Sequence, residues 1–384
     1  MVFGYGIAGR FIFDWIKIFI EDYGIFLIDK KLNVATSFLS AFGLLLVAPI
    51  ASTSAQVDYV MTGEWLTPCD SSDMTRECTI SNLRPFVYPT GIAIDSSNNV
   101  YVVDAWTKEV QKFTSNGDFI MKWGTPGNGD GQFRTPTGIA IDSSNNVYVI
   151  DSSLSNVQKF TSNGDFIMKW GTPGNGDGQF RTPTGIAIDS SNNVYVLHLG
   201  LVNVQKFTSD GEFIMKWGTL GTHDGEFRHP VGIAVDPSSN VYIVDQKNNR
   251  IQKFTSDGGF LTKWGTRCEP KGNPYVIMDS ELYSCIQPQD NEFFYPNGGI
   301  AVDEFSNVYV IDQYNNRIQK FTTNGKFIST ILLPDYRAIV PSYSMLGHSD
   351  IDVDHQGHKI FTTVLDDKIL VFSKVCSDLG KRIC

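Results

Sequence analysis

Short apolar runs separated by polar turns recur along the chain at a fixed interval. The first run of a unit, such as residues 91–94 (Gly-Ile-Ala-Ile), is apolar throughout and ends at an aspartate, here Asp95. Three further runs follow at 100–103, 110–114 and 119–123, bounded by Asn, Asp, Ser or Gly. Short β-branched or aromatic runs between such turn residues predict strands. The pattern therefore predicts units of four antiparallel strands, with the first strand packed on both faces.

The unit is repeated, and one copy is identical to its neighbour. Residues 113–149 recur letter for letter at 160–196, an offset of 47 residues (113 to 160). Four strands at this period form one blade of a β-propeller. A tryptophan recurs in the fourth strand, and we expect it to wedge between blades because indole buries a large area. The prolines that open five units with Pro-x-Gly are Pro89, Pro136, Pro183, Pro230 and Pro296, and the tryptophans are Trp123, Trp170, Trp217 and Trp264.

The last unit lacks one strand, and the amino-terminal part of the chain supplies a candidate for it. Residues 348–372 contain three strand-like runs, whereas residues 57–67 contain one, with Trp65 where the blade tryptophan belongs. Pairing the two segments would close the ring and remove an exposed sheet edge. We therefore predict an all-β fold, a six-bladed β-propeller of four-stranded antiparallel blades, closed by an N-terminal strand that completes the last blade.

The repeat resembles a known family. The pattern Pro-x-Gly-Ile-Ala-Ile-Asp, Asn-Val-Tyr-Val-x-Asp and Asn-Asn-Arg-Ile-Gln-Lys-Phe is similar to the NHL repeat, most clearly at 227–254 and 296–321. The resemblance covers about 57–375 and implies a six-bladed propeller. It implies no single activity, because NHL propellers include protein-binding, RNA-binding and enzymatic members.

Residues 1–55 do not fit the repeat. The uncharged apolar run 35–51 follows Lys30-Lys31 and precedes small residues that end at Ala55, the order of a secretory signal. A retained membrane anchor is the alternative, since the run approaches spanning length. Residues 1–29 are mainly apolar but carry several charged side chains, which indicates either a misassigned start codon or an amphipathic segment on a membrane surface. We expect an N-terminal hydrophobic or signal region (1–55), a propeller (56–375), a cysteine-containing tail (376–384), and a secreted or cell-surface monomer.

Net charge changes the choice of partner. The chain carries a formal charge of −10 with a pI near 5.1, a poor match for a phosphate backbone, so we expect no nucleic-acid partner. Lysines recur on the third strand of the units, and we interpret them as a solvated stripe. These lysines are Lys112, Lys159, Lys206, Lys253 and Lys320.

The six cysteines lie outside the common core of the repeat. Six cysteines allow 15 connectivities, and local pairing is the simplest, because each irregular segment carries two. An exported protein can keep such disulfides. The absence of a Cys-x-x-Cys spacing argues against a zinc site. The expected pairs are Cys69 with Cys78, Cys268 with Cys285, and Cys376 with Cys384.

Linker lengths point to one side of the ring. The spacing from the blade tryptophan to the next Pro-x-Gly proline is 13 residues three times, but 32 from Trp264 and 24 from Trp65. A spacing of 17 separates Ile331 from His348. The enlarged linkers precede blades five, six and one, and loops on a rigid scaffold are where function usually lies. Their aromatic and arginine residues suit a binding patch, although these loops could instead bury their own aromatics. The predicted binding residues are Arg84, Phe86, Tyr88, Tyr275, Tyr283, Phe294, Tyr295, Tyr336, Arg337, Tyr343 and His348.

Three other motifs have structural readings that we favour. Residues 128–131 and their copy at 175–178 lack the ligand series of a calcium loop and read as Gly-rich turns. The aspartates that end the second strands read as turn caps rather than as a catalytic ring. His198 replaces that aspartate in blade three; drift in a duplicated blade is favoured over a pH-sensitive group at the channel mouth. The aspartates are Asp104, Asp151, Asp245 and Asp312.

The enzymatic members of the family offer a direct comparison. Peptidyl-hydroxyglycine amidating lyases are similar propellers that place a metal-binding histidine between the Pro and Gly of the blade motif. The chain has other residues at those six positions, and we expect no metal and no other cofactor. We therefore predict a binding or scaffold module for a protein, a surface glycan or another surface ligand; the alternative is a metal-dependent lyase or hydrolase. The residues at the six positions are Thr90, Thr137, Thr184, Val231, Asn297 and Ser349.

Overall fold

A computed structural model describes residues 59–65, 86–269, 289–294, 296, 299–334, 350–364, 368–376 and 382–383. The described residues all lie in one compact unit of the chain, Ala55–Cys384. Within that part, no helix is long and apolar enough to cross a membrane. The predicted signal region lies outside the described residues.

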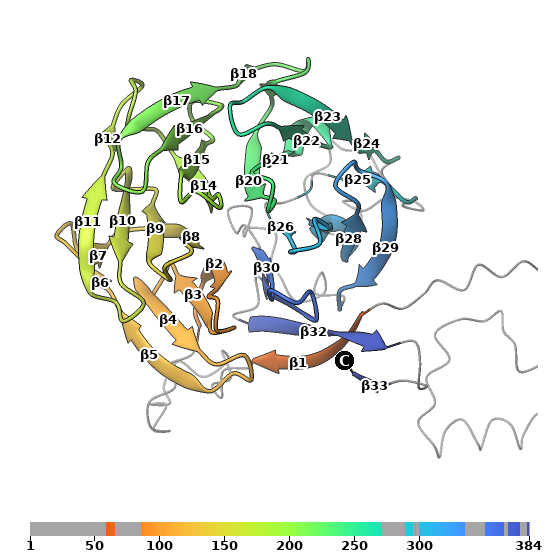
Figure 1. Ribbon diagram of the computed structural model, residues 1–384, viewed down its shortest axis with the longest axis horizontal. Helices are drawn as coiled ribbons and strands as arrows, with labels where there is room; N and C mark the ends of the chain where they lie inside the picture. Colours follow the sequence, from red (N-terminus) through yellow and green to blue (C-terminus); the bar gives the residue numbers. More distant parts are fainter. Residues whose placement is uncertain are drawn as a thin grey trace, which may run out of the picture. The chain divides into compact units, whose positions relative to one another are not determined.

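Six sheets form a closed ring (Figure 1). In each of blades one to five, four consecutive strands pair antiparallel from the innermost to the outermost. Blade one contains β2 (Pro89–Ile94), β3 (Val100–Asp104), β4 (Glu109–Phe113) and β5 (Phe119–Trp123); blade two contains β8 (Pro136–Ile141), β9 (Val147–Asp151), β10 (Asn156–Phe160) and β11 (Phe166–Trp170); blade three contains β14 (Pro183–Ile188), β15 (Val194–His198), β16 (Asn203–Phe207) and β17 (Phe213–Trp217).

Blades four to six complete the ring, and the innermost strands of blades five and six are short. Blade four contains β20 (Pro230–Val235), β21 (Val241–Asp245), β22 (Arg250–Phe254) and β23 (Phe260–Trp264); blade five contains β26 (Ile300–Val302), β27 (Val308–Asp312), β28 (Arg317–Phe321) and β29 (Phe327–Leu332); blade six contains β30 (Ile351–Val353), β31 (Lys359–Val364), β32 (Lys368–Cys376) and β1 (Tyr59–Trp65).

Small elements decorate the blades. Two-residue parallel ribbons follow the outermost strand of blades one to four, and single 3₁₀ turns follow the second strand of blades four and five. The ribbons are β6–β7 (Thr125–Pro126 and Gln132–Phe133), β12–β13 (Thr172–Pro173 and Gln179–Phe180), β18–β19 (Thr219–Leu220 and Glu226–Phe227) and β24–β25 (Thr266–Arg267 and Glu292–Phe293); the 3₁₀ turns are η2 (Gln246–Asn248) and η4 (Gln313–Asn315); and β33 (Arg382–Ile383) pairs with β32.

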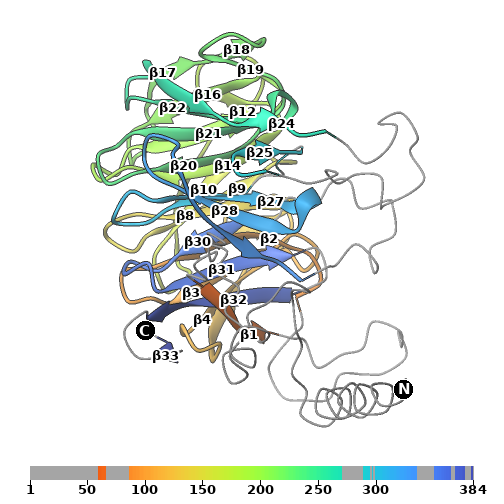
Figure 2. The same cartoon turned by 90° about the vertical axis from the view of Figure 1, so that its right-hand side faces the viewer.

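The predicted closure of the ring is confirmed. Strand β1 pairs antiparallel with β32, so that Trp65 lies opposite Ile369, and Figure 2 shows the two strands side by side. The Trp65 ring packs on Phe113 of blade one and Phe361 of blade six, with ring centroids 5.5 and 5.6 Å away. The other blade tryptophans bridge in the same way; Trp123, for example, contacts Phe160 of the next blade. The prediction that these indoles wedge between blades is therefore confirmed.

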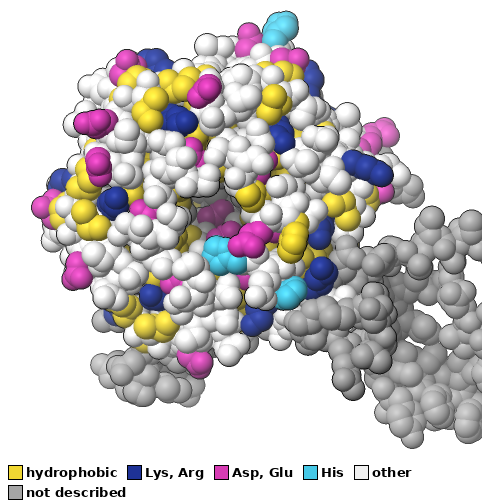
Figure 3. All heavy atoms as spheres, viewed as in Figure 1, with side chains coloured by type: hydrophobic (Ala, Val, Ile, Leu, Met, Phe, Trp, Pro, Cys, Tyr) yellow, Lys and Arg dark blue, Asp and Glu magenta, His cyan; other side chains and the backbone are white. Residues whose placement is uncertain are grey.

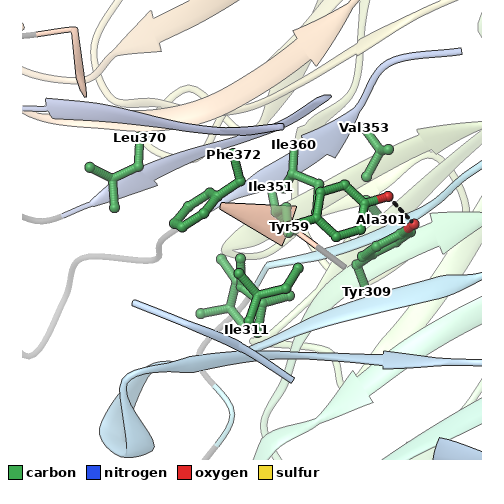
Figure 4. Close-up of a cluster of buried hydrophobic side chains, with 11 residues drawn as sticks. Tyr59, Ala301, Tyr309, Ile311, Ile351, Val353, Ile360, Leu370 and Phe372 are labelled. Atoms are coloured by element: carbon green, nitrogen blue, oxygen red, sulfur yellow. Dashed lines mark hydrogen bonds between the residues drawn. The ribbon is translucent and has the colours of Figure 1, made fainter. Parts of the chain in front are cut away.

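Six hydrophobic clusters form the core of the ring, one at each junction between neighbouring blades, and a small seventh cluster contains Cys268 and Phe294. Figure 4 shows the cluster between blades five and six, where Tyr59 from β1 and Tyr309 from β27 meet. Their hydroxyl oxygens are 3.0 Å apart, and the Tyr59 hydroxyl donates to the Gly357 carbonyl at 2.6 Å. The closing strand therefore contributes to a junction core as well as to a sheet.

Because neighbouring strands are antiparallel, one face of the ring carries two kinds of loop. It bears the linkers between blades and the turns joining second and third strands, and we call it the linker face. The opposite face bears the turns that follow the innermost strands, such as the one at Asp95. There the Asp95 Oδ1 accepts hydrogen bonds from the Ser97 and Asn99 N–H groups at 2.9 and 2.8 Å.

Candidate functional site

The innermost strands enclose a narrow central channel. A cavity in it is lined by the Pro-x-Gly-Ile segments of blades one to four, together with Ile300 of blade five and Asp350 beside β30 of blade six. The cavity has a volume of about 40 Å³, which is enough for a few water molecules. One face of the ring, seen in Figure 3, is hollowed at its centre, with acidic and histidine side chains at the rim. The cavity suits water or one slender chemical group.

The walls of this cavity lack the metal-binding set of the amidating lyases. The positions between Pro and Gly are occupied by Thr90, Thr137, Thr184 and Val231, which all line the cavity. The Thr90 hydroxyl donates to the Pro136 carbonyl of the next blade at 3.1 Å. Among the described residues, no group of three or more His, Cys, Asp or Glu is placed to hold a metal ion. The corresponding Asn297 and Ser349 lie outside the described residues.

The innermost strand of blade six and the residue before it carry two carboxylates that the sequence interpretation missed, Asp352 and Asp350, and Asp350 lines the channel cavity. Aligned on the repeat, Asp350 occupies the position of Gly91 and Asp352 that of Ala93. The Asp350 Oδ2 accepts from the Ile92 N–H of β2 at 3.1 Å, and the Asp352 Oδ2 accepts from Ile94 N–H at 2.8 Å. Burial raises the pKa of each carboxyl to about 7. The signal was present in the sequence, since both aspartates replace the smallest residues of the strand.

The aspartates that end the second strands cap turns, as predicted, and they also hold the linkers. In blade two, the Asp151 carboxylate accepts from the N–H groups of Ser153 and Leu154 in the following turn, at 3.0 and 2.9 Å. It also accepts from Arg134 and Thr135 in the preceding linker, at 2.5 and 3.1 Å. Asp104 does the same in blade one. These carboxylates are fully buried and engaged, so they are structural.

His198 breaks this arrangement in blade three. Its side chain is 0% exposed and packs edge-on against Phe180, with the two ring centroids 4.9 Å apart. Neither ring nitrogen has a hydrogen-bond partner in the described part of the chain. Burial lowers the pKa of His198 to about 3, so the ring is neutral at physiological pH. A solvent-facing group at the channel mouth is therefore the wrong reading of His198.

The third-strand lysines correct another interpretation, because they are buried rather than solvated. The Lys112 ammonium lies 4.8 Å from the centroid of the Tyr101 ring and 3.6 Å from the Asp95 carboxylate. It also donates to the Ser162 carbonyl of the next blade at 3.4 Å. A cation over an aromatic face beside a carboxylate tolerates burial. These lysines therefore connect neighbouring blades. The long apolar stem of lysine allows it to be buried while the ammonium group reaches its partners.

The Gly-rich linkers are structural turns, as predicted. Gly131 donates its N–H to the Gln158 side chain of the next blade at 2.9 Å, and Gln158 donates to the Gln132 carbonyl at 2.7 Å. Asp130 forms an ion pair with Lys169 at 2.8 Å. The two hydrogen bonds and the ion pair fasten the linker to the following blade.

The predicted binding residues are only partly described. Phe86 and Phe294 are buried, Phe86 in the junction core between blades six and one, so these two contribute to packing as the alternative expected. Tyr88 is half-buried at the linker face, and burial raises its pKa. The remaining eight lie outside the described residues: Arg84, Tyr275, Tyr283, Tyr295, Tyr336, Arg337, Tyr343 and His348.

One exposed aromatic on the linker face was not predicted. Trp106 lies in the turn after β3 of blade one, and its side chain is 71% exposed. Other blades carry Ser153, Gly200, Lys247 or Tyr314 at this position. A tryptophan at a solvent-facing turn was a readable signal, because exposed aromatic side chains are enriched at interfaces.

The cysteine pairs stay predictions. Cys268 is buried beside Phe294, but its expected partner Cys285 lies outside the described residues, as do Cys69, Cys78 and Cys384. Cys376 ends β32.

Comparison with known proteins supports the architecture. Residues 227–254 match the model of the NHL repeat, and residues 86–159 match a family model described as a 6-bladed beta-propeller. A sequence comparison with curated proteins finds no match.

Among solved structures, a streptogramin B lyase is similar with a TM-score of 0.52 and 14% identity, over 84% of this chain and 100% of that one. A gluconolactonase from Xanthomonas campestris gives 0.51 and 12%, over 76% and 87%. A protein of unknown function from Bacteroides thetaiotaomicron gives 0.53 and 19%, over 76% and 70%. At these identities the likeness concerns the fold alone. Repeat pattern, blade number and these likenesses agree, and the protein is a six-bladed β-propeller of NHL-type repeats.

Proposed function

We propose that the propeller is a binding module that recognises a protein or a surface glycan on the linker face, over blades five, six and one. The observation that carries this proposal is the asymmetry of that face. Blades two to four follow the repeat closely, whereas the three long linkers precede blades five, six and one. The exposed Trp106 stands on blade one, beside the linker that contains Tyr88.

The chemistry of Trp106 suits recognition. An indole has only two rotatable side-chain bonds, so it loses little conformational entropy on binding, and it covers a large apolar area. Tryptophan is accordingly enriched among the few residues that dominate interface energies. The side chain can pack on an apolar side chain or on the apolar face of a sugar ring, which fits both proposed ligand classes.

A metal-dependent lyase or hydrolase is the second candidate, favoured by the similarity of fold to a streptogramin B lyase and a gluconolactonase. The threonines and valine that line the channel in blades one to four argue against it. Metal analysis of protein purified without chelators separates the two candidates. One equivalent of bound metal per chain, lost together with a hydrolytic or lyase activity, would favour the enzyme.

The binding proposal is tested with a glycan array and a displayed-peptide library, followed by affinity measurement on the best binder. We expect Trp106→Ala to weaken binding at least about 10-fold, as for a central interface residue. Leu220→Ala is the matched control, because Leu220 is 72% exposed on the linker before blade four, outside the proposed arc. Equal affinity of both variants and the natural chain, at unchanged thermal stability, would contradict the proposal.

A further inference from the structure

The face opposite the linker face, which we call the turn face, follows a regular pattern that blade five breaks. It carries the turns after the innermost strands and the turns between third and fourth strands. After the innermost strand of blades one to three, the closing aspartate is followed by two serines, such as Ser96-Ser97, and blade four has Pro237-Ser238 there. Blade five has Glu304 and Phe305 instead. A charged and an aromatic side chain therefore replace two small residues.

The fold of this turn does not require the change. The Asp303 Oδ1 accepts from the Phe305 and Asn307 N–H groups at 3.0 and 2.8 Å, and Asp95 forms the same two bonds in blade one. The Phe305 side chain is 71% exposed and belongs to none of the hydrophobic clusters in the described part of the chain. Its ring is therefore available to a partner without any loss to the core.

Glu304 is held in place by the neighbouring blades. In blade one, the serine at this position donates to the turn of the next blade, from Ser96 Oγ to the Asn145 Oδ1 at 3.0 Å. The Glu304 carboxylate instead lies 3.3 Å from His355 Nδ1 of blade six, and its side chain is still 59% exposed. His355 Nε2 lies 3.1 Å from the Asp95 carbonyl oxygen of blade one. Three blades thus position one exposed carboxylate, and Figure 3 shows acidic and histidine side chains beside the central hollow.

The charge of the turn face indicates the sign of the partner. Five further carboxylates are exposed on the turns between third and fourth strands, where Lys326 is an exposed cation. The exposed lysines Lys169 and Lys216 pair with carboxylates of the linkers instead. A cationic partner is therefore attracted to the turn face. The five carboxylates are Asp118, Asp165, Asp210, Glu212 and Asp257.

The chain itself shows what an aromatic ring and a carboxylate bind when they lie together. In blade four, the Lys253 ammonium lies 5.1 Å from the centroid of the Tyr242 ring and 3.6 Å from the Asp236 carboxylate. The same combination recurs in blades one to three. Phe305 and Glu304 present these two kinds of group on the surface, where a cation from outside can reach them.

We propose that the turn face is a second interaction surface, on which Phe305 and Glu304 bind an arginine side chain of a partner protein. Arginine fits better than lysine, because the planar guanidinium stacks on an aromatic ring and pairs with a carboxylate through two hydrogen bonds. The surface lies on the opposite side of the ring from the linker face, so one propeller can hold two partners at once.

The test selects a displayed peptide library against the natural chain, after subtraction on the variant E304S/F305S. This variant restores the serines of blade one, and the Asp303 bonds go to backbone N–H groups that it keeps, so we expect it to fold. The enriched peptides should contain arginine. By fluorescence anisotropy, the best synthetic peptide should bind E304S/F305S at least about 10-fold more weakly than the natural chain. Citrulline in place of the arginine, which keeps the shape and removes the charge, should weaken binding to the natural chain by a similar factor.

Asp118→Ser is the comparison variant, because it removes an exposed carboxylate from the same face in another blade. It should weaken binding of the peptide far less than E304S/F305S does. An equal loss in the two variants would overturn the proposal, since the face would then attract cations through its overall charge alone. Enriched peptides without arginine, or no peptide that distinguishes the natural chain from E304S/F305S, would also overturn it.

Discussion

The substitution His198→Asp should stabilise the propeller, and the chain contains its own reference for the effect. Residues 113–149 and 160–196 are identical, and blades two and three differ next at Ile150 and Leu197 and then at Asp151 and His198. In blade two the carboxylate holds four backbone N–H groups. In blade three the imidazole is buried with both nitrogens unpartnered within the described residues.

The residue before the proline also differs in backbone conformation among the blades. Thr182, which precedes the blade-three proline, adopts φ = 51°, and His229 in blade four adopts 66°. Its counterpart Thr135 in blade two donates its N–H to Asp151 and is absent from the positive-φ residues. A β-branched residue in the left-handed region costs about 1–2 kcal/mol. Blade four keeps its aspartate, Asp245, which accepts from the Arg228 N–H at 2.6 Å, so the left-handed residue does not depend on the loss of the carboxylate. What the lost carboxylate leaves in blade three is the unsatisfied imidazole ring.

The magnitude follows from the unsatisfied imidazole and from the hydrogen bonds that a carboxylate would accept. Leaving a buried polar group unsatisfied costs about 1–3 kcal/mol, and burial of the new carboxylate offsets part of what its hydrogen bonds contribute. We expect a net gain of about 2 kcal/mol for His198→Asp, or roughly 4 °C in Tm for a chain of this size.

Calorimetry and urea unfolding at pH 7 measure this gain, with Asp151→His as the reverse change in blade two, where a similar loss is expected. The histidine effect should also grow in acid. A His whose folded pKa lies below its unfolded value loses stability as pH falls from about 6.5 toward 3. A Tm of His198→Asp equal to or below that of the natural chain would refute the reasoning.

Two further predictions concern the junctions. Gly164→Ala should lower the free energy of unfolding by more than about 2 kcal/mol, since φ is +80° and the new Cβ would lie 2.8 Å from Trp123. Gly178→Ala should lower it by only about 1 kcal/mol, because its Cβ would meet nothing within 4 Å. Equal losses of stability in chemical denaturation would show that the tryptophan contact is unimportant. Arg250→Ala should lower the free energy of unfolding by about 3–5 kcal/mol, because it removes the charged partner of the buried Asp245 carboxylate, 2.8 Å from Arg250 Nε. A loss of stability below about 1 kcal/mol, which is typical of a surface ion pair, would contradict this prediction.

Much of the fold could be predicted from the sequence because the repeat states each local choice several times. The Pro-x-Gly step, the closing aspartate and the fourth-strand tryptophan recur, so strand boundaries and blade number follow from counting. Closure by the segment around Trp65 was also predictable, since a three-stranded last unit needs a partner.

The site was harder to predict, because function lies where the repeat is broken. Asp350 and Asp352 were visible as exceptions, but their meaning depends on a distance between neighbouring strands that a sequence does not give. The lysines misled for a related reason: a charged residue on a strand reads as exposed until the aromatic ring and carboxylate that surround it are known.

The division of the interior into six junction cores has a consequence for how the molecule can change. Where consecutive blades have the same amino-acid sequence, their contact surfaces are chemically equivalent. A blade can therefore pack against either neighbour with the same contacts. Gain or loss of a whole 47-residue module (113 to 160) would leave those contacts chemically intact. The number of blades is fixed instead by the curvature of the ring and by strand β1, which must still pair with β32.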